Sequence, residues 1–224
     1  MNEEKEMYLD VPVIKNFEYC KYTYLHRLAF KHELKQLYLN EKLDVREYFE
    51  LNKRSEIHDM DKMVLYLFWS KPEASNYHKH HAPHHIFTFV DGIIPSDIDI
   101  MESLIDFQCA PMTKPDKQLN AYQTVMERKS NYIDIYKPYL EKLGYKESDT
   151  IEEIEFVNTV NNMEIKPIDI LKACANYLYE NFTDNIYTEL KSKLCSIEEL
   201  TRLITYADNF DIYKYFNTYR PFNQ

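Results

Sequence analysis

The chain has 224 residues, 45% of them hydrophobic, which is enough to bury a sizeable core as one domain or as one domain with an appendage. Its net charge of −10 and its pI near 5.3 argue against broad nucleic-acid binding, which needs a basic surface. No apolar run reaches the roughly 18 residues of a membrane span, and the acidic N-terminal residues differ from a signal peptide, so we expect a soluble cytoplasmic protein without membrane association.

The scarcity of glycine bears on both fold and function. Only Gly92 and Gly144 occur, which excludes the glycine-rich phosphate loops of Rossmann and P-loop nucleotide-binding proteins. An all-β fold with many tight turns is disfavoured, whereas several segments carry apolar residues at the 3.6-residue period of a helix. The four cysteines are far apart and form no CxxC pair, so neither a zinc knuckle nor a disulfide framework is indicated. The sequence predicts an all-α protein.

Two helices are expected in the first seventy residues. An apolar stripe predicts a helix over residues 16–39, with His26 on it. Ser55 could cap the next helix, which would end before the Lys-Pro pair that follows residue 70. His58 and Asp59 would then lie in the first turns of that helix.

The stretch from Pro72 to Pro83 is polar and rich in histidine, and no helix is assigned to it. Pro83 is suited to the first position of a helix that would run to Val90. His84 and His85 would lie at its N-terminus, which disfavours imidazolium and would keep both rings neutral.

Another helix is expected after the loop around residues 92–95. Ser96 or Asp97 would cap it, and it would run through Phe107. Glu102 and Asp106 are one turn apart and would share a face.

The character of the chain changes near Pro111, beyond which no histidine occurs. We therefore predict a metal-binding helical domain over residues 1–110 and a helical extension over residues 111–224 that packs on it. Helices are expected over residues 168–179 and, after a capping box, over residues 197–206. The aromatic-rich extension is compatible with a homodimer.

The histidines cluster in the sequence. All of them fall in the first 85 residues, and five lie in the stretch HKHHAPHH. Imidazoles with nearby carboxylates suit Zn, Mn, Fe or Ni. The stretch by itself fits a weak surface patch equally well. The eight histidines are His26, His32, His58, His78, His80, His81, His84 and His85.

The order of the potential ligands supports the metal-site interpretation. His26, the adjacent pair His58-Asp59 and the distal Asp106 follow one another as in the HD-domain superfamily of metal-dependent phosphohydrolases, which the chain resembles. Members with two or three metals insert a lone histidine and then a His-His pair. His78 or His80, followed by His84-His85, resembles that longer series.

The strings HDMDKM, HKHHAPHHIFTF and MESLIDF also resemble an uncharacterised bacterial and phage family, a domain of unknown function that reads HDxSKF, HxxxNPHH and EMxxDW. The resemblance covers about residues 26–107. Asp61 departs from the usual serine and adds a carboxylate beside the metal set. Ala82 departs from the usual asparagine and removes an amide that could support the His-His pair.

The resemblance to HD enzymes implies one or two divalent ions and hydrolysis of a small anionic phosphomonoester or phosphodiester, such as a nucleotide or cyclic nucleotide. Asp59 would bridge the ions and orient the attacking water. Lys62 would neutralise charge on the phosphate, and His78 or His80 would complete the second site or protonate the leaving oxygen. The implied metal ligands are His26, His58, Asp59, His78, His84, His85 and Asp106.

Three questions stay open from the sequence. Glu102 could be a further ligand, a partner that orients a histidine, or a solvated carboxylate. The same ligands could hold two irons for oxygen activation, as in some HD-fold oxygenases. The metal could also be structural, with the tyrosine-rich C-terminal half as a binding interface.

Overall fold

The computed structural model describes residues 16–85, 95–114, 118–149, 158–160, 162–166, 169–170, 173–174 and 176–177. These residues form helices and connecting turns without a strand, which confirms the predicted all-α fold. The elements are α1 (Phe17–Leu39), α2 (Val45–Ser55), α3 (Met60–Phe68), α4 (Lys71–His81), the 3-10 turn η1 (Pro83–His85), α5 (Asp97–Thr113), α6 (Ala121–Arg128), the 3-10 turn η2 (Ser130–Tyr132) and α7 (Ile133–Leu143). Within this described part, no helix combines the length and the apolar character needed to cross a membrane.

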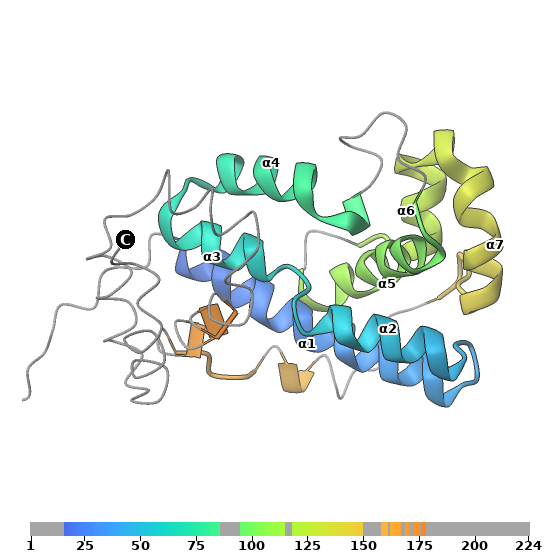
Figure 1. Cartoon of the computed structure of the whole chain (residues 1–224), viewed down its shortest axis with the longest axis horizontal. Coiled ribbons are helices and arrows are strands. Elements are labelled where there is room, and N and C mark those ends of the chain that lie inside the picture. Colours follow the sequence, from blue (N-terminus) through green and yellow to red (C-terminus); the bar gives the residue numbers. More distant parts are fainter. Residues whose placement is uncertain are drawn as a thin grey trace, which may run out of the picture.

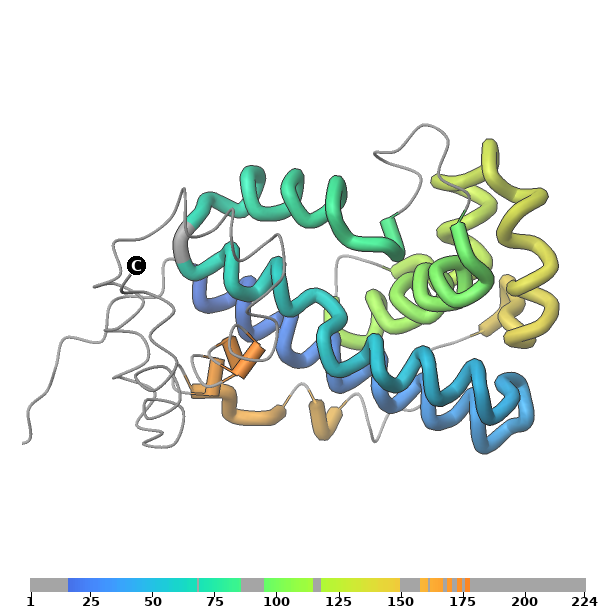
Figure 2. The backbone as a smooth tube through the Cα atoms, viewed as in Figure 1, coloured from blue at the N-terminus to red at the C-terminus, as the bar shows by residue number. Residues whose placement is uncertain are grey.

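The long helix α1 organises the bundle. It packs against α2, α3 and α5, and α2 and α3 follow one another along its length (Figure 1). Helix α4 packs on α3, while α6 and α7 pack on α5 at the other end of the molecule (Figure 2). The bundle therefore brings the start of α3, the end of α4 and the middle of α5 toward the middle of α1.

Two hydrophobic clusters meet along α1. Cys20 and Leu25 of α1 belong to a cluster with the buried face of α3. Phe30 and Leu34 belong to a second cluster, which α5, α6 and α7 complete. His26 lies between these two sets of apolar residues on α1 and is almost fully buried. A polar site at this position is shielded from water by apolar packing on both sides.

The apolar stripe and the cap predicted for α1 and α5 are found where expected. The helix predicted over residues 16–39 is α1, and Ser96 caps α5. The Ser96 hydroxyl accepts a hydrogen bond from the backbone N–H of Asp99 at 3.2 Å, and the Asp99 carboxylate accepts one from the Ser96 N–H at 2.9 Å. This reciprocal pair satisfies two N–H groups that the helix itself leaves unbonded.

The prediction for residues 55–68 is wrong in one respect. Ser55 ends α2 instead of capping a new helix, and its hydroxyl donates back to the carbonyl of Asn52. His58 and Asp59 lie in the turn between α2 and α3, and Asp59 takes a left-handed conformation with φ of 58°. Aspartate is among the few non-glycine residues that adopt this conformation readily, so the turn forms without a glycine.

The histidine-rich stretch is also more ordered than its composition suggests. Residues 71–81 form α4, in whose first turn Pro72 lies. The side chain of Glu73 accepts hydrogen bonds from the N–H and hydroxyl of Ser70, which starts the helix. Of the helix predicted from Pro83 to Val90, the described part is the single turn η1, and residues 86–94 lie outside the described residues.

The chain beyond residue 110 is described in part. Pro111 lies inside α5, and residues on both sides of it contribute to one hydrophobic cluster. The division of the chain near this residue stays a prediction. Of the predicted helix 168–179, residues 169–170, 173–174 and 176–177 are described as helical. The predicted helix 197–206 lies outside the described residues.

Leu104 tests the packing of α5 against α1. Its side chain is fully buried in the second cluster, so replacement by alanine should lower the free energy of unfolding by about 2 to 5 kcal/mol. Leu39→Ala is the matched control, because Leu39 is 61% exposed and its loss should change stability by less than about 0.5 kcal/mol. Urea unfolding of both variants measures the difference, and equal stabilities would contradict this packing.

Candidate metal centre

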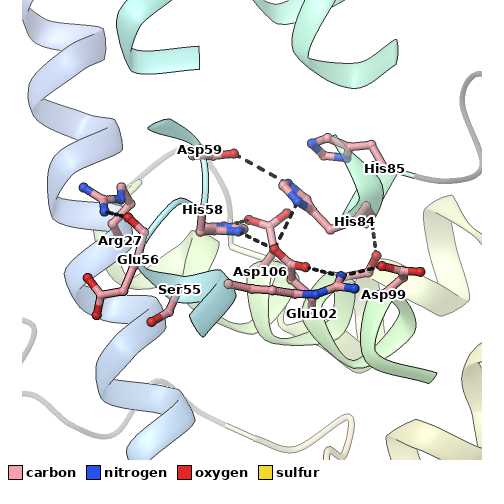
Figure 3. A network of polar contacts seen from close by, with 12 residues as sticks. Arg27, Ser55, Glu56, His58, Asp59, His84, His85, Asp99, Glu102 and Asp106 are labelled. Atoms are coloured by element: carbon pink, nitrogen blue, oxygen red, sulfur yellow. Dashed lines mark hydrogen bonds and ion pairs between the residues drawn. The ribbon is translucent and has the colours of Figure 1, made fainter. Parts of the chain in front are cut away.

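Side chains from five segments converge at the junction of the two hydrophobic clusters, and Figure 3 shows those of the α2–α3 turn, η1 and α5. Helix α1 and the α2–α3 turn contribute on one side, and α4, η1 and α5 on the other. All seven predicted ligands belong to this set, which Glu102 joins: His26, His58, Asp59, His78, His84, His85, Glu102 and Asp106. Most of them are buried, and Asp106 and His85 are partly exposed.

One group of potential ligands, the His26 group, consists of His26, His58 and Asp59, whose donor atoms lie within 4.8 Å of one another. Asp106 joins it from α5. Its Oδ1 is 2.7 Å from Nε2 of His26 and 3.7 Å from Nε2 of His58. Two ligands that bind one ion at about 2.1 Å and at a right angle lie about 3 Å apart, so these separations fit a shared ion.

A second group, the His78 group, consists of His78, His84 and His85. Nε2 of His78 is 3.1 Å from Nε2 of His85. Asp59 lies between the two groups, because its Oδ1 is 2.9 Å from Nε2 of His78 and 3.5 Å from Nε2 of His84. A single carboxylate is therefore within reach of both sets of histidines.

Four nitrogen and oxygen atoms of the candidate ligands are buried and lack a hydrogen-bond partner: Nδ1 of His26, Nε2 of His58, Nε2 of His84 and Oδ1 of Asp59. The 2.9 Å approach of Asp59 to His78 does not have hydrogen-bond geometry. Leaving such atoms without a partner costs about 1 to 3 kcal/mol each. Imidazole and carboxylate ligands suit a divalent ion, which would satisfy those of these atoms that it binds. The buried groups could therefore hold a metal ion.

Carboxylates also hold the opposite nitrogens of two histidines. Nδ1 of His58 donates to Oε1 of Glu102 at 3.0 Å, and Nδ1 of His78 contacts both oxygens of Asp61 at 2.8 and 3.0 Å. Glu102 is in turn held by Arg54 at 2.9 Å. This arrangement leaves Nε2 of each ring available to an ion, as metal-binding histidines require. Of the three roles left open for Glu102, these contacts favour that of a partner that orients His58. His58, His84 and Glu102 also form a third possible ligand group.

The charges of the site keep its carboxylates ionised. Burial raises the pKa of Asp59, Glu102 and Asp106, but the neighbouring histidines lower it more, together with Lys62 in the case of Asp59. The pKa of each of these carboxylates therefore lies well below its usual value. Ionised carboxylates bind divalent ions without first losing a proton.

The two neighbouring histidines of η1 differ in their electrostatics. Burial lowers the pKa of His84, but the carboxylates of Asp59 and Glu102, 3.5 and 3.4 Å from its ring nitrogens, raise it more, so it lies well above the usual value. Burial and the charges of His84 and His78 lower the pKa of His85 to about 2. The helix N-terminus expected to act on both rings is the cause of neither shift. Carboxylates surround His84, and η1 is one turn, too short for a helix dipole.

The two other predicted catalytic residues lie in different surroundings. Lys62 is partly buried, and its ammonium pairs with Oδ2 of Asp59 at 2.8 Å. This pairing outweighs burial and raises the pKa of Lys62. His80 is exposed on α4, and its Nδ1 donates to the carbonyl of Asn76 at 2.6 Å. The structure brings Lys62 to the site and does not bring His80 into either histidine group.

A pocket of about 450 Å³ opens onto the centre. Its lining includes His58, Asp59, His84 and Glu102 of the candidate centre, together with Arg54. The remaining lining is partly apolar: Ile57, Asp61, His81, Ala82, Pro83 and Tyr177. A small molecule could reach the potential ligands through this opening.

Nothing in the sequence indicated that Arg54 contributes to the site. The Arg54 guanidinium bonds Asp99 and Glu102 of α5. The amide that is missing at Ala82 has a substitute in the structure, because the hydroxyl of Ser103 donates to the carbonyl of His84 and ties η1 to α5. These contacts join residues far apart in the chain, and the sequence alone offers no signal for them.

The fold and the site define a helical bundle with a buried histidine and carboxylate cluster that could bind metal. A scan against protein-family models, a search of curated proteins and a search of solved structures each found no match. Membership in the HD superfamily therefore stays a prediction, and the proposal of a function depends on the geometry of the site.

Proposed function

We propose that this protein is a metal-dependent phosphohydrolase that acts on a small phosphomonoester or phosphodiester, such as a nucleotide or cyclic nucleotide. One observation carries the proposal: Asp59 lies between two groups of buried ligands, 2.9 Å from His78 and close to His26 and His58, and it lines a pocket. Two ions about 3.5 to 4 Å apart and bridged by a carboxylate are typical of enzymes that hydrolyse phosphate esters.

The residues have separable roles in this proposal. The His26 group with Asp106 would hold one divalent ion, and the His78 group would hold another, with Asp59 shared. Bound divalent ions supply positive charge that polarises a phosphoryl oxygen and makes a bound water nucleophilic near neutral pH. The positive charge of the ions would balance the anionic ligands of the centre. A phosphate could then bind there although the chain has a net charge of −10.

The protein's own cations support the same chemistry. Lys62 keeps the Asp59 carboxylate in place and adds a positive charge beside it. Arg54 lies at the pocket and holds Glu102, which in turn orients His58. His80 has no part in the proposal, because its exposed ring bonds within α4.

Turnover with and without metal tests the proposal. Untagged protein is treated with a chelator, divided, and assayed with a panel of nucleotides, cyclic nucleotides and bis(p-nitrophenyl) phosphate in the presence of Mn²⁺, Zn²⁺, Ni²⁺ or Fe²⁺. We expect phosphate ester hydrolysis that depends on added metal and is lost again on chelation.

Two other results would contradict the proposal in informative ways. Unfolding on chelation, with no turnover of any ester, would indicate a structural metal. Stoichiometric iron with an absorbance change in air, again without ester hydrolysis, would indicate oxygen chemistry at the same ligands. Circular dichroism and elemental analysis of the assayed samples distinguish these two results.

A further inference from the structure

Asp61 makes a contact that the roles above do not use. It lies in the first turn of α3, two residues after Asp59, and its side chain is buried. Both carboxylate oxygens lie within hydrogen-bond distance of Nδ1 of His78, at 2.8 and 3.0 Å. Because an ionised carboxylate only accepts, Nδ1 carries the proton and Nε2 is the nitrogen that remains for a metal.

The geometry on the other side of the His78 ring fits this division. Nε2 of His78 points toward the candidate centre, 2.9 Å from Oδ1 of Asp59 and 3.1 Å from Nε2 of His85. His78 lies on α4 and Asp61 on α3, so the contact fixes the ring across two helices that pack together. The backbone of α4 alone would leave rotation about the ring torsion.

His84, the other buried histidine of the His78 group, has a longer contact between its Nδ1 and a carboxylate. Nδ1 of His84 is 3.4 Å from Oε1 of Glu102, and Glu102 also accepts from His58 and Arg54. The carboxylate of Asp61 contacts His78 with both of its oxygens. Asp61 therefore has a local effect on one histidine of one group.

We propose that Asp61 is a positioning residue for the second metal ion: it holds Nε2 of His78 toward the ion and strengthens His78 as a ligand, so that the His78 group binds metal tightly. The proposal rests on the two-metal centre of the proposed function and does not require hydrolysis. Loss of a carboxylate that orients a metal-binding histidine typically weakens metal binding by about 10- to 100-fold.

The test measures Mn²⁺ binding by the full chain. Free Mn²⁺ is followed by its electron paramagnetic resonance signal while the ion is added to chelator-treated wild type, Asp61→Ala and Asp61→Asn. Asparagine keeps the shape and an acceptor oxygen for Nδ1, whereas alanine removes both. The matched control is Asp134→Asn, an exposed aspartate in the first turn of α7. Circular dichroism at each end point records folding.

We expect wild type and Asp134→Asn to bind two ions. Asp61→Ala should bind the first ion as wild type does and the second about 10- to 100-fold more weakly, with Asp61→Asn in between. Two ions bound with wild-type affinity by folded Asp61→Ala would overturn the inference, as would equal weakening of both ions in folded Asp61→Asn. Fewer than two ions on wild type would overturn the two-metal centre itself. If Asp61→Ala does not fold, Asp61→Asn decides by the same criteria.

Discussion

Replacement of Asp59 by asparagine should lower turnover of a phosphate ester by about a thousandfold, which corresponds to about 4 kcal/mol of lost transition-state stabilisation at a metal centre. Asp59 is the carboxylate that lies within reach of both histidine groups, so a neutral amide there would weaken both proposed ion sites at once. Asparagine tolerates the left-handed backbone at this position, so the variant should keep the α2–α3 turn.

The control and the readouts separate charge from fold. Asp134→Asn makes the same chemical change at an exposed position of α7 and should retain turnover and metal content. Metal per chain, thermal unfolding and initial rate are measured for the two variants and wild type. A folded Asp59→Asn protein with wild-type rate and metal content would show that Asp59 is not the shared ligand.

Replacement of Glu102 by alanine should lower stability to an extent similar to the loss of a buried core side chain. Glu102 is 4% exposed and joins Arg54, His58 and His84, so its loss leaves these groups without their common partner. We expect the free energy of unfolding to fall by about 3 kcal/mol, at the low end of the range for a broken buried ion pair because Arg54 is partly exposed and keeps Asp99.

Urea unfolding checks this expectation in samples without added metal. Glu141→Ala on α7 is the control, since Glu141 is exposed and its loss should change stability by less than about 0.5 kcal/mol. Glu102→Gln keeps an acceptor for Nδ1 of His58 and should lose less stability than the alanine variant. Equal stability of Glu102→Ala and Glu141→Ala would contradict the network drawn in Figure 3.

The sequence predicted the parts of the fold that depend on local signals. The apolar period of α1 and the Ser96 cap of α5 are signals between residues that are close in the sequence, and both helices form as expected. Helix α4 was missed because its histidines and charged residues leave no apolar stripe. The Ser70 and Glu73 pair was the available signal, and it does begin that helix.

The turn that holds His58 and Asp59 could not be predicted in the same way. Ser55 looks like a helix cap in sequence, but its hydroxyl bonds backward to Asn52 and ends α2. Asp59 has a left-handed backbone conformation, which a glycine in the sequence would have signalled and an aspartate does not. As a result the His-Asp pair was placed on a helix, whereas it lies in a turn that presents both side chains to the site.

The candidate ligands were easier to predict than their supports. Histidine is a common metal ligand, and the order of the histidines and aspartates along the chain indicated which of them could form a site. The roles of Asp61 and Arg54 depend on contacts with His78 and Glu102 across other helices. Such contacts follow from tertiary packing, which a single sequence does not encode in any local pattern.

The metal content of the wild-type chain, purified without a histidine tag and measured by elemental analysis, shows whether the buried histidines and carboxylates form a metal centre. We expect about two divalent ions per chain, from Mn, Fe, Zn or Ni, either as purified or after incubation with the metal and removal of the excess. Folded protein that contains no metal and takes up none on incubation would contradict the metal centre, and with it the proposed hydrolysis.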